Sequence, residues 1–214
     1  MFLSDRDLKY ALECEDLICN PPPTEYGLSG IDLHLDKIEE AKIWDPARRK
    51  KSLSGLAAKS SVGFGDFEYK QFAESCAIPV PSLVKGENQP VCRDGDCVIL
   101  RPGGFLLWLT KEKVGTPTKK ARYICFINGK STRARLGLLV HMTAPTIDAG
   151  WWGQVTLEMA NLGPFDLSLE EGDAIAQLVV AMMSSPPTQE KPIRGIQAGQ
   201  KSVTGKVGKS AKKQ

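Results

Sequence analysis

Apolar and polar residues alternate along several short stretches of this chain, in the two-residue rhythm that is typical of β-strands. The first clear case lies within residues 31–38, where Ile31, Leu33 and Leu35 alternate with polar neighbours. Because successive side chains of a strand point to opposite faces, this apolar set is predicted to face the core. Further strands are predicted within residues 96–112, 122–129, 154–161 and 165–183. Turn residues separate these stretches, so a mainly β sandwich or barrel is favoured over alternating strands and helices.

A short amphipathic helix is predicted near the start of the chain, within residues 4–17. Ser4 is a favourable N-cap, and the apolar positions that follow it are Leu8, Leu12 and Leu17. The run of prolines at 21–23 cannot continue a helix, so the helix is predicted to end before it.

Two segments lack a regular pattern. Residues 39–85 contain a basic, Gly- and Ser-rich middle, and we expect a variable surface insert there. After about Pro187 the chain loses apolar content and becomes lysine-rich. The predicted organisation is therefore one domain over residues 1–186, followed by a mobile basic arm over residues 187–214.

Charge and composition exclude several classes of protein. The formal net charge is +3, and much of the excess falls in residues 205–214. Such a run is typical of a solvated tail, so we expect no nucleic-acid partner. No apolar run approaches the roughly 18 residues of a membrane span, and the charged start of the chain is unlike a signal peptide. We therefore expect a cytoplasmic protein with no membrane partner and with reduced thiols.

The metal-ligating residues do not form a zinc pattern. There are two histidines, and the six cysteines are scattered. Cys92 and Cys97 flank an Arg-Asp-Gly-Asp turn, which predicts a hairpin with the two thiols across a strand pair and is a weak metal signal. The histidine and paired-cysteine signature of zinc deaminases is absent, so we expect no zinc.

One acid stands out on a predicted strand. Val155, Leu157 and Met159 share one face of residues 154–161, and Thr156 and Glu158 share the other. If the apolar set faces the core, Glu158 points into a space where an acid shielded from water could act as a general acid or base. The alternative is an exposed or salt-bridged glutamate on a half-solvated strand.

Upstream of this strand lies Gly-Lys-Ser-Thr-Arg-Ala-Arg, at residues 129–135. Its hydroxyls and cationic side chains could together hold phosphate. It is not a Walker A loop, because residues 121–128 contain no glycine. The alternative is a basic turn between strands. Further on, Asp148 lies in a turn-rich stretch, and one of Trp151 and Trp152 is expected in the core while the other could line a pocket or an interface.

The order of these motifs resembles the dCTP deaminase family of the trimeric dUTPase superfamily. The matching elements in this chain are LSDRDL, NPPP, GIDLHL, LRPGGFLLWLTKE, GKSTRARLGLLVHMTA, IDAGW, VTLE and GDAIAQL. The resemblance implies a distorted β-barrel or jelly roll of the dUTPase type and a homotrimer. It also implies zinc-independent, hydrolytic deamination of dCTP to dUTP and ammonia in pyrimidine deoxynucleotide metabolism.

The resemblance also implies roles for individual residues. Glu158 would be the general acid/base, Ser131 would orient the water, Arg135 would hold Glu158 or balance charge, and the backbone near Ala144 would help to position the water. The residues expected to bind substrate are Lys130, Ser131, Thr132, Arg133, Ala134 and Arg135 along the triphosphate, Asp148 at the deoxyribose, Thr156, Leu157 and Glu158 at the cytosine, and Gln200 from the arm. Mg²⁺ would bind with the triphosphate, and no protein side chain would ligate it.

The chain departs from the family pattern at several positions. Lys130 stands where the family usually has Arg, which removes a bidentate fork for phosphate. The arm keeps Gln200, but Ile196 holds the place of the usual Lys, and no Tyr follows Tyr123. These departures predict weaker binding of the triphosphate, unless the lysines of the tail replace the missing contacts.

Other functions stay open at this point. A bifunctional enzyme that continues from dUTP to dUMP and pyrophosphate is the main alternative, since IDAG and QKSV resemble that branch. A regulatory or nucleotide-depleting defence protein of the same fold is another, and dUTP or dTTP could then be ligands. A pure dUTPase is disfavoured because that branch lacks the matching Glu. A β-rich structural protein without chemistry is the least favoured.

Overall fold

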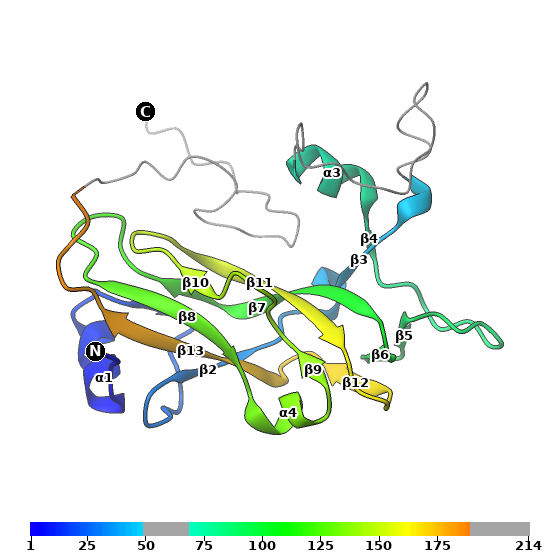
Figure 1. Cartoon of the computed structure of the whole chain (residues 1–214), viewed down its shortest axis with the longest axis horizontal. Helices are drawn as coiled ribbons and strands as arrows, with labels where there is room; N and C mark the ends of the chain where they lie inside the picture. The colour runs from blue at the N-terminus through cyan, green and yellow to red at the C-terminus, as the bar shows by residue number, and fades with distance from the viewer. Residues whose placement is uncertain (49–68, 189–214) are drawn as a thin grey trace.

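Three antiparallel β-sheets and short helices make up the protein in the computed structural model, which describes residues 1–48 and 69–188 (Figure 1). The helices are α1 (Asp5–Glu13), the 3-10 turn η1 (Ile38–Glu40), α3 (Tyr69–Cys76) and α4 (Ser131–Arg135). The strands are β1 (Ile18–Asn20), β2 (Ile31–His34), β3 (Lys42–Trp44), β4 (Ala77–Pro79), β5 (Val91–Asp94), β6 (Cys97–Leu100), β7 (Phe105–Gly115), β8 (Tyr123–Gly129), β9 (Leu138–Leu139), β10 (Thr146–Ile147), β11 (Trp152–Asn161), β12 (Leu167–Glu170) and β13 (Ala174–Met182). The expectation of a mainly β fold is confirmed.

The long strands β7 and β11 form the centre of the largest sheet. Its order is β4-β3-β7-β11-β9, and β1 pairs with another part of β7. A second sheet has the order β10-β8-β13-β2, and a third has the order β12-β6-β5. No helix in the described ranges is both long and apolar enough to cross a membrane.

The apolar residues of the predicted alternation lie in the core. Ile31, Leu33 and Leu35 are fully buried, whereas the polar residues between them are partly exposed. From the opposite sheet Trp108 enters the same core, and its indole N–H donates to the carbonyl oxygens of Asp36 at 3.0 Å and Lys37 at 3.1 Å. A buried indole therefore satisfies its one polar atom on the backbone.

Helix α1 is shorter than the sequence predicted. It begins at the expected cap, where Ser4 and Asp7 form a capping box. It ends before Leu17 because Glu15 takes a left-handed conformation with φ of +58°. The amides of Glu15 and Asp16 then bond to the carbonyls of Leu12 and Ala11, which is a Schellman termination.

Of residues 39–85 the structure describes 39–48 and 69–85, and most of the basic, Gly- and Ser-rich middle where the surface insert is expected lies outside the described residues. Where the structure describes the segment, β3 pairs with both β4 and β7, so the segment extends the main sheet, and α3 precedes β4. Strands of three residues are too short to show a periodic pattern, which is why the sequence did not predict them.

The hairpin predicted around Cys92 and Cys97 is confirmed, with Gly95 at φ of +59° in its turn. Its thiols are not opposite each other, however, because Cys92 is paired with Ile99 and Cys97 with Asp94. The register of the two-residue turn therefore separates the thiols. The C-terminal arm lies outside the described residues beyond Thr188.

Candidate functional site

Glu158 on β11 forms an ion pair with His141. The carboxylate oxygen Oε2 contacts the imidazole Nδ1, and Nε2 of the same ring lies 2.9 Å from the carbonyl oxygen of Ala144. The His141 side chain is 9% exposed and that of Glu158 is 35% exposed, so the pair is half enclosed with its carboxylate on the open side.

The two faces of β11 are arranged as predicted. Val155, Leu157 and Met159 are buried in the core, and Thr156 and Glu158 lie on the other face. The side chain of Leu157 therefore points away from Glu158, so the predicted contact of Leu157 with a base would be made by its backbone. The salt-bridged alternative for Glu158 also holds in part, since its partner is His141.

The contact between Nδ1 and Oε2 calls for a proton between them, because an unprotonated nitrogen and a carboxylate are both acceptors. A carbonyl oxygen can only accept, so Nε2 of His141 carries a hydrogen and donates it to Ala144. One further proton between Nδ1 and Oε2 makes either an imidazolium with a carboxylate or a neutral imidazole with a carboxylic acid. Burial on its own would lower the pKa of His141, but the hydrogen bond and charge of Glu158, together with the Ala144 carbonyl, raise it above its usual 6.5. This arrangement suits a carboxylate that takes up and returns protons.

His141 was not predicted as a site residue, because sequence reasoning considered the histidines only as zinc ligands. The available signal was its position in the VHMTA stretch, three residues before Ala144. Its contact with Glu158 depends on the loop between β9 and β10, which no local periodicity encodes.

The basic segment at 130–135 forms a short helix rather than an irregular turn. Lys130 is the N-cap of α4, and the side chains of Ser131, Thr132 and Arg135 are exposed, as is Ala134. Lys130 Nζ donates to Asp32 Oδ2 at 2.5 Å, and Arg133 Nη2 lies 3.8 Å from Asp173 Oδ1. The segment therefore presents hydroxyl and guanidinium donors on the surface.

Asp32 anchors the start of this helix to β2 and β13. Gln177 Nε2 donates to its other carboxylate oxygen at 3.1 Å. Partial burial would raise the pKa of Asp32, but the bonds from Lys130 and Gln177 and the nearby positive charges lower it below its usual value. Asp32 thus stays ionised and fixes the direction of Lys130.

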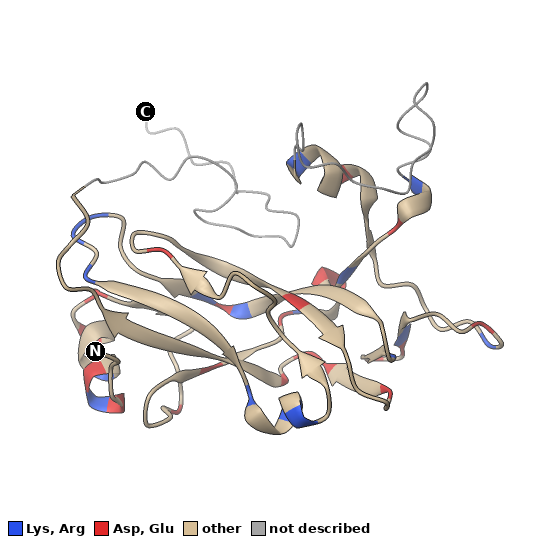
Figure 2. Ribbon diagram, in the orientation of Figure 1, with Lys and Arg blue, Asp and Glu red and all other residues tan. Residues whose placement is uncertain are grey.

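Within one chain, the structure does not bring the two halves of the expected site together. In the described part of the chain, no hydrogen bond or ion pair joins Ser131 or Arg135 to Glu158. Figure 2 shows the basic residues of α4 at the lower edge of the molecule. The strand that follows α4, β9, pairs with β11 only at Ala160 and Asn161, beyond Glu158. Arg135 therefore does not hold Glu158 of the same protomer, which corrects that expectation for a single chain.

Asp148 lies in a tight turn, as expected. Its side chain is exposed, its carbonyl accepts from the Trp151 amide at 3.1 Å, and Gly150 adopts φ of +88°. The Gly150 amide donates to Thr116 Oγ1 at 2.7 Å. Trp151 packs against the core, whereas Trp152 begins β11 and is half-buried. Gln200 lies outside the described residues.

Comparisons with known proteins place the chain in a family. A family model described as dCTP deaminase-like matches residues 2–183. The chain is 42% identical over 188 residues to "dCTP deaminase, dUMP-forming" of Halobacterium salinarum, covering 87% of this chain and 83% of that protein. It is 30% identical over 206 residues to "dCTP deaminase" of Natronomonas pharaonis, covering 94% of this chain and 89% of that protein.

A solved structure supports the fold. The crystal structure of 2'-deoxycytidine 5'-triphosphate deaminase from Agrobacterium tumefaciens matches with a TM-score of 0.54 at 14% identity. The match covers 85% of this chain and 48% of that chain, so the present chain spans about half of that protein's length.

Proposed function

The chain belongs to the dCTP deaminase family, and from this premise we propose that it deaminates dCTP by hydrolysis, releasing ammonia and dUTP. The observation that carries the proposal is the Glu158–His141 pair, fixed through Ala144 on the open face of β11. Such a pair offers the proton acceptor and donor that the reaction needs, next to a strand that can hold a flat base.

The chemistry proceeds by addition and elimination at C4 of cytosine. Glu158 takes a proton from water as the water oxygen bonds to C4, and N3 is protonated. The C4–N4 bond then breaks, and a second proton transfer lets the amine leave as ammonia. A single carboxylate can move these protons in turn. His141 holds the carboxylate in place and takes up part of the charge change.

The exposed donors of α4 suit the triphosphate. Ser131 and Thr132 offer hydroxyls, and Arg133 and Arg135 offer planar guanidinium groups for phosphate oxygens. This donor set fits an anion rather than a bare metal ion, so Mg²⁺ would reach the site on the nucleotide, where it offsets phosphate charge. Lys130, held by Asp32, adds a positive charge at the start of the helix.

We further propose a homotrimer in which α4 of one protomer completes the Glu158 site of another. The lack of a hydrogen bond or ion pair between Arg135 and Glu158 in the described part of one chain supports it, because the proposed reaction needs both the phosphate donors and the carboxylate on one nucleotide. The protein would work on the deoxynucleotide pool of the cytoplasm.

The names of two relatives favour a second product, dUMP. The relative that is 42% identical carries the name "dUMP-forming", as does a 33% identical relative from Corynebacterium kroppenstedtii. This chain could therefore continue from dUTP to dUMP and pyrophosphate. Incubation with dCTP and Mg²⁺, followed by chromatographic identification of the products, tests both: dUTP or dUMP with ammonia supports deamination, and unchanged dCTP contradicts it.

A further inference from the structure

The face of the main sheet that carries Glu158 also carries a small apolar cluster. On β7, Leu109 is paired with Thr156 and Leu107 with Glu158. Both leucines are buried, and they form a small cluster separate from the main core, packed against Trp44 and Phe105. Because these residues lie beside Glu158 rather than behind it, aromatic side chains border the proposed site.

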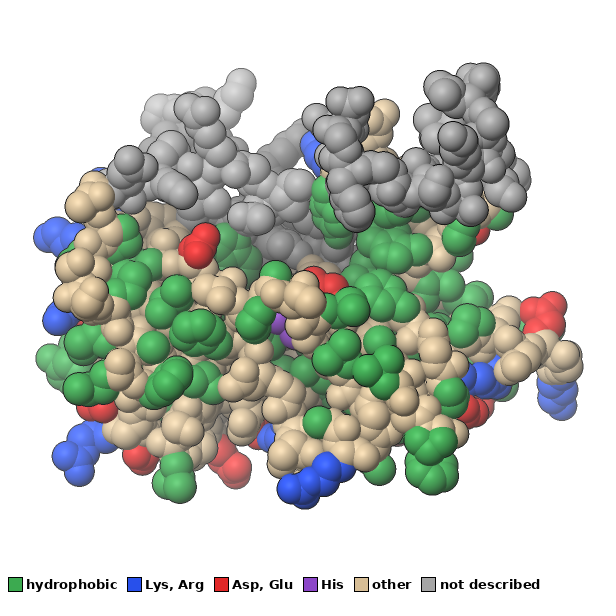
Figure 3. Space-filling model, viewed as in Figure 1, with side chains coloured by type: hydrophobic (Ala, Val, Ile, Leu, Met, Phe, Trp, Pro, Cys, Tyr) green, Lys and Arg blue, Asp and Glu red, His purple; other side chains and the backbone are tan. Residues whose placement is uncertain are grey.

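Trp44 connects this apolar cluster to helix α3. Its ring lies 5.0 Å from that of Phe72 and 6.4 Å from that of Tyr69, the latter edge-on with an interplanar angle of 89°. These are favourable aromatic geometries. Figure 3 shows apolar side chains continuing from the region of α3 onto the strands beneath it. The helix is thus held over the same face of the sheet as Glu158.

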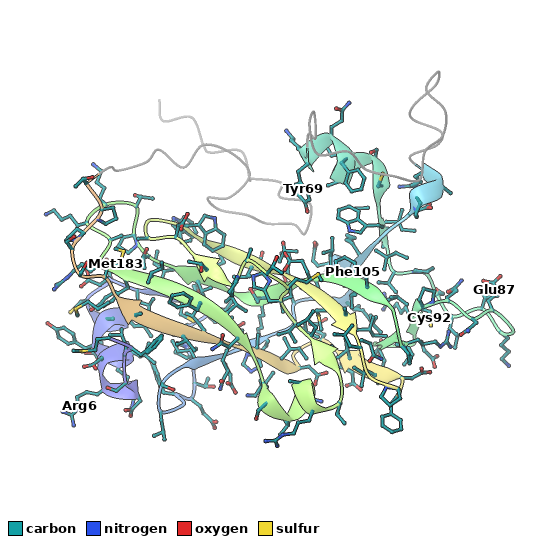
Figure 4. All side chains as sticks on the ribbon, viewed as in Figure 1. Arg6, Tyr69, Glu87, Cys92, Phe105 and Met183 are labelled. Carbon is teal, nitrogen blue, oxygen red and sulfur yellow. The ribbon has the colours of Figure 1, made fainter. Side chains whose placement is uncertain are left out.

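Tyr69 is the first residue of α3, and its ring contacts Trp44 on the face of the sheet that carries Glu158. Burial, and then the charge of Glu158, raise the pKa of the Tyr69 phenol, so the hydroxyl stays protonated and lies within the field of that carboxylate. Figure 4 shows Tyr69 projecting from α3 on the side of the helix that faces the strands. Tyr69 therefore places an aromatic ring on the side of the strands that carries Glu158.

We propose that Tyr69 is a substrate-contacting residue, whose ring packs against the pyrimidine base while the base lies beside Glu158. This rests on the proposed function of the same site, and it gives helix α3 a part in recognising the base. A flat aromatic ring over a base excludes water and gains stacking energy with any pyrimidine. The ring, more than the hydroxyl, supplies this contact, and Trp44 holds it in orientation.

Steady-state kinetics with dCTP on the full-length protein tests the proposal. Tyr69→Leu removes the planar ring but keeps apolar contact with Trp44, and it should raise KM about tenfold or more, in line with the loss of one base–aromatic contact. Tyr69→Phe should stay within about twofold of the parent, because the ring remains. Tyr10→Leu, at an exposed tyrosine on α1, is the matched control and should leave both constants unchanged.

Inorganic tripolyphosphate separates base recognition from general damage, because it has no base. Its inhibition constant should be the same for the parent and Tyr69→Leu. Equal weakening of tripolyphosphate and dCTP would contradict the proposal, as would a KM for Tyr69→Leu that stays at the parent value. If Tyr69→Leu fails to fold by thermal melting, Tyr69→Met, which fills a similar volume against Trp44, takes its place with the same expectations.

Failure of this proposal is distinguishable from failure of the proposed function. A parent protein that leaves dCTP unchanged contradicts deamination itself. A parent that deaminates dCTP, alongside a Tyr69→Leu variant of unchanged KM, contradicts only the role of Tyr69.

Discussion

Glu158 and His141 come from opposite sides of a turn-rich loop and form an ion pair that is anchored to the backbone at Ala144. The pair brings together a partly exposed carboxylate and an almost fully buried imidazole. The Ala144 carbonyl accepts the hydrogen on Nε2. The proton shared with Glu158 therefore lies between Nδ1 and the carboxylate. The carboxylate is therefore oriented before any substrate arrives.

The first prediction concerns the contribution of His141 to turnover. His141→Asn can still donate a hydrogen bond toward Glu158 but cannot carry a positive charge. We expect kcat for dCTP to fall by about 10- to 100-fold, since the positive charge beside the general base is lost while the base remains. KM should change much less, because the proposed phosphate and base contacts are intact. A kcat equal to that of the parent would show that His141 has no part in the proton transfers.

The second prediction is a pH dependence of stability. The folded pKa of His141 is raised above its unfolded value of 6.5. Its contribution to stability is therefore fully present below pH 6.5 and is lost as the pH rises through the folded value. The difference in unfolding free energy between the parent and His141→Asn should be largest at mildly acidic pH and shrink toward alkaline pH. Urea titrations across this range measure it, and a difference that grows with pH would contradict the pairing.

The sequence predicted the parts of the fold that have local periodicity. Ile31, Leu33 and Leu35 alternate over enough residues to reveal a strand, and Ser4 marks the start of a helix by its chemistry alone. Glu158 stands out because a charge on a strand flanked by apolar residues is unusual. By contrast, β3 and β4 are too short for a pattern, and they join the sheet through long-range pairing with β7.

The side chains around Glu158 could not be predicted either, because they meet through long-range packing. The contact with His141, like the contact of Tyr69 with Trp44, exists only once distant segments pack on one face of the sheet. The sequence also could not predict how Arg135 and Glu158 lie relative to each other in space. Motif resemblance assigned both to one site, whereas in a single chain α4 lies next to β9, at the far end of β11, and no hydrogen bond or ion pair of the described residues joins Arg135 to Glu158.

The third prediction tests whether two protomers share a site. Neither Glu158→Gln nor Arg135→Ala should have appreciable activity alone. After the two are unfolded, mixed in equal amounts and refolded together, roughly a quarter of the parental activity should return, because random assembly pairs an intact Glu158 with an intact Arg135 in that fraction of sites. Each variant refolded separately is the control. A mixture with no more activity than the two controls would mean that both residues act within one chain.

The fourth prediction concerns a buried carboxylate outside the site. Glu112 is 5% exposed, and it accepts from the His34 amide at 2.9 Å and contacts His34 Nδ1 at 2.7 Å. His34→Ala leaves this acid without its side-chain partner and should cost about 1–3 kcal/mol of unfolding free energy. His34→Gln, which can restore a donor, should recover part of the loss. Chemical denaturation measures both, and a neutral His34→Ala would show that the backbone bond alone suffices.

The most direct measurement of the central claim compares dCTP turnover with dCTP binding for Glu158→Gln. The substitution keeps the shape and the contact with His141 but removes the proton acceptor. We predict that affinity, measured by calorimetry, stays close to the parent value while turnover falls by about 10²–10⁴-fold, the usual cost of losing a general base. Turnover within about tenfold of the parent, well short of that general-base effect, would contradict the assignment of Glu158 as the group that moves the protons.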